Sequence, residues 1–408
     1  MGWIGFNVYV EVMKDLLYLK ISKIKNIFRM LLMVNMISSG KISILIPVYR
    51  ESDLLEPLIE DLLKDPYEEK EIFVIIDEPT QKSLDLSKRF SGENVHFIFN
   101  GVRKGKANVL NEIAKKSKGD ILLFLDSDVL IEKNGESFLK AVASEMNDAD
   151  ILEIKKGIIR NSFVAKVASY DYLGFNFTSL YFSRSIGRCL GINGAAFAVK
   201  KSTFEELGGF RRVICEDLDI ATRSFTNGAR FKFAENISVH TKAPSSWREW
   251  FIQRKRWGIG AAFWFKENLR ILKYAVRKYP KVIIPSLLLI FPALPIMLAN
   301  LFIPDDLSLK MLYVSLILLS TKMNIFMPPT ALTSTTLLML RNFLIFLGSL
   351  ATYSTTFYLI ARKLHFHFNF LEFTVFYFIA APLWLLIIVV SLIKVYVKPH
   401  NIKVDWKV

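Results

Sequence analysis

Cysteine is scarce in this chain of 408 residues, and its two cysteines, Cys189 and Cys215, lack the spacing of a disulfide framework or a thiolate metal site. The sequence therefore excludes a disulfide-stabilised secreted domain and favours a reducing, cytosolic compartment. A cleavable signal peptide is also lacking, because charged residues interrupt the apolar positions of residues 1–37. Residues 1–40 are predicted to form an amphipathic segment on a membrane, with a short spanning helix as the alternative.

Long uncharged runs are missing from the first two thirds of the chain and are concentrated in the last third. Residues 282–303 and 373–393 carry no charge, and each run can cross a hydrocarbon core of about 30 Å. Residues 311–340 and 342–360 are further apolar runs, the first of them interrupted. We predict about four transmembrane helices within residues 282–397, with three as the alternative. An even number returns the basic tail, residues 398–408, to the cytoplasmic side.

Acidic residues are in the minority, with 38 Asp and Glu against 53 Lys and Arg, a formal net charge of +15. This balance suits anionic lipids, nucleotide phosphates or nucleic acid. Residues 245–281 combine many basic residues with four of the seven tryptophans, so we expect interface helices in the headgroup region of membrane lipids. Their place before an apolar run argues against a nucleic-acid partner. A non-catalytic, basic, membrane-anchored lipid-binding protein stays one hypothesis.

Short β-branched or aromatic runs alternate with helical patterns in residues 41–244. Residues 41–49, 71–77, 95–100 and 120–128 have the composition of strands, and residues 104–118 that of a helix. This alternation predicts an α/β fold with a mostly parallel sheet. Ligands bind such sheets beyond the carboxyl ends of the strands, where Asp77, Asn100 and Asp126 fall.

Two acidic motifs could carry chemistry. Asp126 and Asp128 follow an apolar strand, and such carboxylates bind Mg²⁺ or Mn²⁺ together with substrate phosphates. A solvated turn would have the same sequence. Glu216 and Asp217 could supply a general base, or could be first-turn acids of a helix.

A third motif, Gln253, Arg256 and Trp257, lies in the basic segment. Arginine can bind a diphosphate through paired hydrogen bonds, and tryptophan can stack on a sugar. By itself the motif would equally fit a basic interfacial helix.

In order and combination, these motifs resemble those of the family 2 glycosyltransferases of the GT-A fold, especially the cellulose, hyaluronan and chitin synthases and ceramide glucosyltransferase. The matching residues follow one another over about half of the chain: Pro47, Tyr49 and Glu51; Asp77 and Glu78; Arg103, Gly105 and Lys106; Asp126 and Asp128; Glu216 and Asp217; Gln253, Arg256 and Trp257. The resemblance implies a Rossmann-like, nucleotide-sugar-binding GT-A catalytic domain over residues 41–244, followed by an α-helical transmembrane domain.

The resemblance also implies roles for individual residues. The nucleotide sugar would be bound by Pro47, Tyr49, Glu51, Asp77, Arg103, Lys106, Asp126, Gln253, Arg256 and Trp257. Asp128 and Asp126 would hold the Mg²⁺ or Mn²⁺ ion, with His240 as a further ligand. Asp217 would be the general base beside Glu216, with Asp219 and Asp171 as the next candidates. Glu78 and the segment around His240 depart from the family's commoner residues.

The implied reaction is the inverting transfer of a sugar from a nucleotide-diphosphate donor, foremost a UDP-sugar, in a single displacement. Polymer synthases of this resemblance carry membrane helices before the catalytic domain, and residues 1–40 offer at best one. We therefore expect a multi-pass protein of the cell membrane that acts at the cytoplasmic face on a lipid or lipid-linked acceptor. Processive polysaccharide synthesis on a glycan acceptor is the alternative.

Overall fold

The computed structural model of the chain describes residues 40–90, 94–133, 135–295, 298, 305–324, 326, 328 and 333–397. The predicted amphipathic segment, up to residue 39, and the predicted tail, residues 398–408, lie outside these residues. The chain divides into two compact units after Gly40, and the described helices and strands belong to the unit that begins at Lys41.

A mixed sheet of eight strands forms within the described residues, in the order β3-β2-β1-β4-β7-β6-β8-β5. The strands are β1 (Ile42–Tyr49), β2 (Lys70–Asp77), β3 (Val95–Asn100), β4 (Ile121–Leu125), β5 (Val129–Ile131), β6 (Ile151–Ile158), β7 (Ala196–Lys200) and β8 (Phe231–Thr241). Strands β1 to β4 are the four predicted ones, and they pair in parallel. Strand β7 runs antiparallel to β4 and β6, which makes the second half of the sheet mixed. The predicted α/β class is confirmed.

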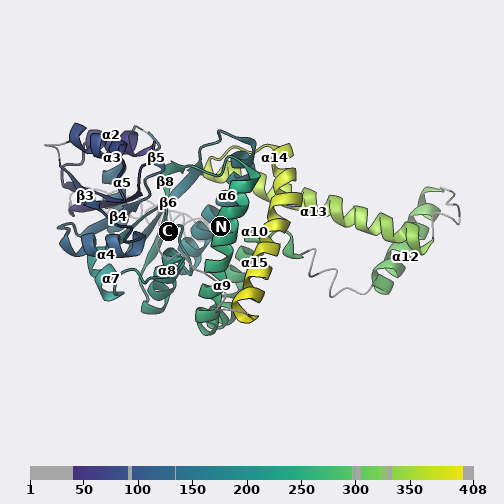
Figure 1. Cartoon of the computed structure of the whole chain (residues 1–408). Coiled ribbons are helices and arrows are strands. Elements are labelled where there is room, and N and C mark those ends of the chain that lie inside the picture. The colour runs from purple at the N-terminus through teal and green to yellow at the C-terminus, as the bar shows by residue number, and fades with distance from the viewer. Residues whose placement is uncertain are drawn as a thin grey trace, which may run out of the picture. The chain divides into compact units, whose positions relative to one another are not determined.

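Helices cover both faces of this sheet (Figure 1). One face carries α2 (Leu55–Lys64), α3 (Gln81–Arg89) and α5 (Phe138–Met146), and the other carries α4 (Lys106–Lys116), α7 (Lys201–Glu206) and α8 (Glu216–Asn227). Successive side chains of a strand point to opposite faces, so Ile44 and Ile46 of β1 join the first core and Leu45 joins the second. The strand ends between these two layers remain accessible to a ligand.

A further group of helices packs beside the sheet around an aromatic core that includes Tyr170, Phe357, Phe373 and Trp384. Its members are α6 (Phe163–Ile186), α9 (Trp247–Lys278), α10 (Pro280–Ile290), α13 (Ser334–Leu364), α14 (Phe370–Val375), the π-helical turn η2 (Phe376–Ala380) and α15 (Ala381–Val397), while α12 (Asp305–Met323) contacts α13. Because α6 also packs against β6 and β8, the helical region and the sheet are joined through it.

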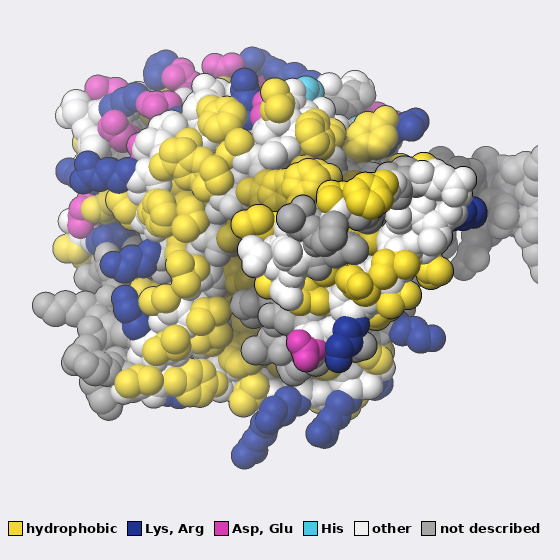
Figure 2. All heavy atoms as spheres, turned by 90° about the vertical axis from the view of Figure 1, so that its right-hand side faces the viewer, with side chains coloured by type: hydrophobic (Ala, Val, Ile, Leu, Met, Phe, Trp, Pro, Cys, Tyr) yellow, Lys and Arg dark blue, Asp and Glu magenta, His cyan; other side chains and the backbone are white. Residues whose placement is uncertain are grey.

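Two helical runs among the described residues are long and apolar enough to cross a membrane, Ser334–Leu364 and Phe370–Val397. They carry exposed apolar side chains such as Phe343, Leu347 and Leu386. Figure 2 shows hydrophobic side chains spread over much of one face of the molecule, with lysine and arginine side chains at its lower border.

The apolar runs of the sequence do not all coincide with helices. The run 342–360 lies inside α13, which begins at Ser334 and so includes the end of the run 311–340. The run 282–303 is interrupted, because α10 ends at Ile290, shortly before Pro292. The predicted count of about four spans stays a prediction.

The basic, aromatic segment forms one long helix, α9, and its predicted place in the headgroup region stays a prediction. Trp250 and Arg254 are fully buried in the protein. The Trp264 indole donates a hydrogen bond to Thr222 of α8, with an Nε1–Oγ1 distance of 2.8 Å. These tryptophans therefore pack α9 onto neighbouring helices. The amino-acid composition of the segment does not distinguish such packing from contact with membrane lipids.

Candidate active site

Asp77, at the end of β2, holds the loop that leads into α4. Its carboxylate accepts hydrogen bonds from the Asn100 side chain and from the backbone N–H groups of Lys104 and Gly105, each at 2.9 Å. Gly105 has a φ of +87°, which glycine adopts without strain. The predicted nucleoside contact of Asp77 stays a prediction, and the structure adds that this residue orders the loop.

Tyr49 and Arg103 approach each other beyond the ends of β1 and β3. The Arg103 guanidinium lies over the Tyr49 ring, 4.3 Å from its centroid, and the Tyr49 hydroxyl donates to Glu78 at 3.1 Å. Glu51 accepts a hydrogen bond from Thr80 at 2.6 Å. Pro47 lies two residues before Tyr49 in β1. The four predicted nucleotide-binding residues of this region thus lie near the same edge of the sheet.

Lys106 is the centre of a charge cluster built from three distant segments. Its ammonium donates to Asp126 Oδ1 at 2.7 Å and lies 3.5 Å from Glu216 Oε1. Burial lowers the pKa of the Lys106 amine, but the carboxylates of Asp126 and Glu216 outweigh this effect and raise it overall. The cluster brings together the start of α4, the end of β4 and the start of α8, as the order of strands predicts.

Asp217 and Glu216 begin α8 as partly buried acids. Asp217 accepts hydrogen bonds from the backbone N–H groups of Gly194 at 3.0 Å and Leu218 at 2.8 Å. Burial raises the pKa of Asp217, and the Lys106 charge opposes the shift. Burial also raises the pKa of Glu216 to about 7, against the opposing charge of Lys106. Both acids are therefore stronger bases than exposed carboxylates.

Gly194 explains how the backbone comes so close to Asp217. A Cβ atom at residue 194 would lie 3.0 Å from Asp217 Oδ2, closer than van der Waals contact allows. The glycine-rich stretch 191–196, which precedes β7, is thus needed to position this carboxylate.

Asp128 follows the end of β4, and burial together with the nearby Asp126 charge raises its pKa to about 6. Two such carboxylates repel each other when ionised, so the pair fits a hard divalent cation. Within the described residues, no three His, Cys, Asp or Glu side chains form a metal-binding group. His240 lies instead against Gly157 in the wall of a separate cavity. The metal-ligand set of Asp126, Asp128 and His240 stays a prediction.

The motif Gln253, Arg256 and Trp257 lies on α9, close to the start of α8. Gln253 and Trp257 are partly buried, whereas Arg256 is exposed. Burial raises the pKa of the Cys215 thiol, and the charge of Arg256 acts in the opposite direction from within electrostatic range of this thiol. A Cβ atom at Gly260 would lie 2.3 Å from Cys215 Sγ, so glycine permits this close approach of α9.

The alternative bases, Asp219 and Asp171, are both paired with arginine. Asp219 accepts hydrogen bonds from Arg211 at 3.0 Å and from Arg223 at 2.8 Å. Asp171 accepts one from Arg254 at 2.7 Å. An arginine partner stabilises the ionised carboxylate and weakens it as a base. Asp217, which accepts backbone hydrogen bonds, is the better candidate.

The pair of Arg254 and Asp171 was not recognised in the sequence. Arg254 is fully buried, and its guanidinium lies 5.4, 4.6 and 5.2 Å from the ring centroids of Trp250, Trp257 and Trp384. The pair connects α6, α9 and α15. Its one signal in the sequence was an acid inside the aromatic stretch of residues 163–182.

A second buried pair lies closer to the reaction site. Lys156 of β6 donates to Glu153 at 2.9 Å, and Glu153 also accepts a hydrogen bond from the backbone N–H of Asn193 at 3.1 Å. Lys156 lies within electrostatic range of Asp217 and Asp126. Charged residues inside an apolar strand were the signal that could have identified this pair.

Fold and site together define an enzyme domain of the Rossmann-like α/β class, with its acidic centre at the carboxyl ends of parallel strands. The family model described as "Glycosyl transferase family 2" matches residues 43–208. Residues 43–208 therefore match a family 2 glycosyltransferase domain, the family that the motifs resemble.

Curated relatives agree with this assignment. The chain is 27% identical over 244 residues to the probable glycosyltransferase YdaM of Bacillus subtilis, which covers 55% of this chain and 56% of the relative. It is 26% identical over 225 residues to a poly-beta-1,6-N-acetyl-D-glucosamine synthase of Staphylococcus aureus, which covers 54% of each. The chain thus spans about half the length of the curated relatives that it matches.

Solved structures show more distant likenesses. The mannosyltransferase PcManGT of Pyrobaculum calidifontis, in complex with GDP-Man and Mn²⁺, has a TM-score of 0.47 and 19% identity, and covers 57% of this chain and 64% of that one. TarS of Staphylococcus aureus, in complex with UDP-GlcNAc, has a TM-score of 0.39 and 17% identity, and covers 50% and 59%. Neither likeness carries a conclusion about the substrate of this chain.

Proposed function

We propose that this protein is an inverting, metal-dependent hexosyltransferase that moves a sugar from a UDP-sugar to a lipid or lipid-linked acceptor at a membrane. The observation that carries the proposal is Asp217, a partly buried carboxylate held by two backbone N–H groups and with a raised pKa, next to the cluster of Lys106 and Asp126. A base and a site for negative charge at one strand edge are what transfer from a nucleotide diphosphate requires.

In the proposed reaction, Asp217 accepts the proton of the acceptor hydroxyl. The hydroxyl oxygen forms a bond to the anomeric carbon while the bond from that carbon to the diphosphate oxygen breaks, which inverts the configuration. Lys106 and Arg256 stabilise the negative charge that develops on the leaving nucleotide diphosphate. General-base assistance supplies about 10² to 10⁴ in rate, so positioning and charge stabilisation must supply the rest.

Asp128 and Asp126 are the residues that would hold a Mg²⁺ or Mn²⁺ ion. Asp128 is buried beside another carboxylate, a situation that a bound divalent cation relieves. Such an ion would supply positive charge for the diphosphate.

We place the protein at the membrane because its two long apolar helices expose hydrophobic side chains (Figure 2). The basic side of α9 and the reaction site would then face the cytoplasm. Extraction of native membranes with alkaline carbonate tests this location, because an integral protein stays in the pellet. Protease protection in vesicles of known orientation tests the side.

The nature of the acceptor separates the proposal from its alternative. Similarity to a poly-beta-1,6-N-acetyl-D-glucosamine synthase favours polysaccharide synthesis as the second candidate. The test is incubation of the purified chain in lipid with labelled nucleotide sugars, Mg²⁺ and Mn²⁺, followed by separation of lipid-soluble from polymeric product. Asp217→Asn serves as the matched inactive control. A polymeric product would show that the acceptor is a growing polysaccharide and not a lipid. If no nucleotide sugar gives a labelled product, the transferase proposal is contradicted.

A further inference from the structure

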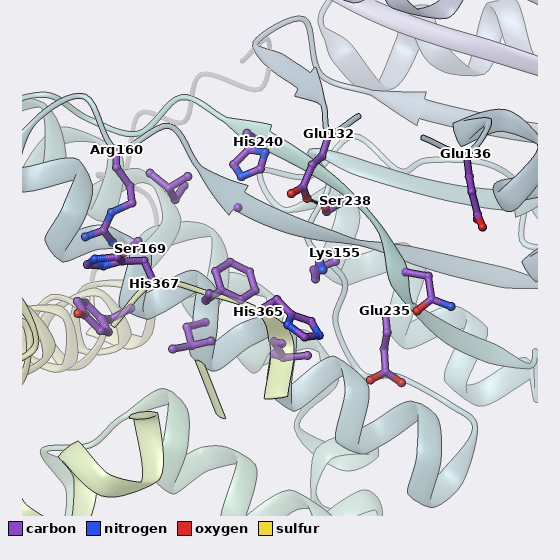
Figure 3. Close-up of a pocket in the computed structure, with 17 residues that line it drawn as sticks. Glu132, Glu136, Lys155, Arg160, Ser169, Glu235, Ser238, His240, His365 and His367 are labelled. Atoms are coloured by element: carbon purple, nitrogen blue, oxygen red, sulfur yellow. Dashed lines mark hydrogen bonds between the residues drawn. The ribbon is translucent and has the colours of Figure 1, made fainter. Parts of the chain in front are cut away.

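A cavity of about 590 Å³ opens between strands β5, β6 and β8, the beginning of α6 and residues 364–367, which join α13 to α14. Figure 3 shows its lining side chains around a common space, with Lys155 near the middle and Glu132, His240 and His365 around it. Residues from five segments of the chain thus form one polar site.

This cavity is separate from the reaction site. Lys156 of β6 lies within electrostatic range of Asp217 and Asp126. Lys155 and Gly157 line the cavity instead. Because successive side chains point to opposite faces of a strand, the two sites lie on opposite faces of the sheet.

Lys155 is the feature that indicates a ligand. Only 9% of this residue is exposed, its side chain lines the cavity, and within the described residues no hydrogen bond or ion pair of its ammonium is found. Burial lowers its pKa, while the charges of Glu132 and Glu235 oppose the shift from a distance. The ammonium is thus available to donate hydrogen bonds to an oxygen atom of a ligand in the cavity.

The remaining lining residues disfavour a ligand with a net charge. Arg160 pairs with Glu372, Glu235 pairs with Arg184, and Glu132 accepts a hydrogen bond from Ser238. Glu132 also acts against the charge of Lys155 across the cavity, so the wall has no large surplus of positive charge for an anion.

Donors and acceptors in this wall alternate with apolar surface. Lys155 and the imidazoles of His240 and His365 lie beside the side chains of Leu173 and Phe366. Each hydroxyl group of a sugar both donates and accepts hydrogen bonds, and a sugar ring has apolar faces. A cavity of this volume and lining suits a small, hydroxyl-rich molecule.

We propose that this cavity binds a short, uncharged oligosaccharide, with Lys155 donating to its hydroxyl oxygens and Phe366 packing on a sugar ring. The proposal goes beyond sugar transfer, because the ligand is held on the face of the sheet opposite to Asp217, where no glycosidic bond is made.

The test uses the full chain in detergent with saturating UDP and Mg²⁺. Isotope-labelled, uncharged di- to tetrasaccharides of glucose, mannose and N-acetylglucosamine serve as probes, and binding is followed by saturation-transfer NMR and calorimetry. We expect at least one probe to bind in the presence of UDP. Lys155→Met keeps the apolar stem but removes the donor, and should weaken this binding by about tenfold.

The matched control is Lys133→Met, since Lys133 is an exposed lysine paired with Asp61 outside the cavity. It should bind the probe normally. Phe366→Ala provides a second test that leaves the sheet unchanged, and thermal unfolding shows that each variant is folded.

Four results would overturn the proposal: no probe binds, UDP displaces the probe, Lys155→Met binds normally, or inorganic phosphate binds in its place. If the chain does not bind UDP, the proposed transferase function is contradicted. Binding of the saccharide probes to the cavity can still be measured in that case.

Discussion

Two charge clusters of this protein have similar members but opposite surroundings. Lys106 meets Asp126 and Glu216 at the edge of the sheet, and its side chain keeps 22% of its surface exposed. Arg254 meets Asp171 inside the helical region, where its side chain is fully buried among three tryptophans.

The clusters also differ in charge balance. At the sheet edge, one lysine faces the acids Asp126, Glu216 and Asp217, and the surplus negative charge contributes to the raised pKa values there. Between the helices, one arginine faces one aspartate. An accessible and unbalanced cluster can accept a cation or a proton, whereas a sealed and balanced pair can only hold helices together.

The largest expected effect is the loss of sugar transfer in Asp217→Asn, which would show that the cluster at the edge of the sheet is the reactive one. Asp217→Asn keeps the shape of the side chain but removes its basicity, so sugar transfer should fall by at least about 10². UDP affinity and thermal stability should stay close to those of the parent. Product formation at saturating donor and metal ion measures the effect. Near-normal turnover would remove Asp217 as the base, and loss of UDP binding would move it into the donor site.

Loss of the buried pair of Arg254 and Asp171 should lower the stability of the protein and not act on the chemical step of sugar transfer. Arg254→Met leaves Asp171 buried without its partner and should lower the free energy of unfolding by about 3 kcal/mol. Arg248→Met, at an exposed position of the same helix, is the control and should have little effect. Denaturant unfolding of the purified chain in detergent measures both.

The double variant Arg254→Met with Asp171→Leu sharpens this result, because it removes both charges together. It should recover much of the stability lost in Arg254→Met. A double variant as unstable as the single one would show that the tryptophan contacts of Arg254, and not its charge pair, stabilise the helices.

Substitution of Asp128 tests whether the surplus negative charge at the edge of the sheet binds a metal ion. Asp128→Ala should weaken the Mg²⁺- or Mn²⁺-dependent part of UDP binding by about tenfold or more, because it removes the more deeply buried ligand. Binding without metal should change little. Calorimetry with and without EDTA measures both, and an unchanged metal dependence would exclude Asp128 from the site.

Substitution of Glu216 should have the smallest effect on the rate of sugar transfer, but it should change how the stability of the protein depends on pH. Its folded-state pKa of about 7 lies above the unfolded value, so the folded protein loses stability as the pH rises from about 4.5 to 7. Glu216→Gln removes this loss and should be more stable than the parent at pH 8, by about 1 kcal/mol, but not at pH 4. Thermal unfolding at both pH values tests this, while transfer should fall only a few-fold. A stability difference independent of pH would contradict the assignment.

Much of the reaction edge could be predicted from the sequence alone. The alternation of apolar runs defined the four parallel strands, and residues that follow parallel strands must meet at one edge of the sheet. Asp77, Asn100 and Asp126 were located in this way, and the family resemblance added Lys106. The order of the motifs added Asp217, which lies far away in the chain and joins the cluster through the start of α8.

The directions of individual side chains were decided only by the tertiary structure. Arg254 and Arg256 lie in one basic run, yet Arg254 is buried and Arg256 is exposed, because the close contact of Gly258 with Ser391 and of Gly260 with Cys215 sets how α9 is rotated against its neighbours. Lys155 and Lys156 likewise belong to two different sites, because successive side chains of β6 point to opposite faces of the sheet. A sequence determines which elements form, but the rotation of a helix and the register of a strand depend on partners that are distant in the chain.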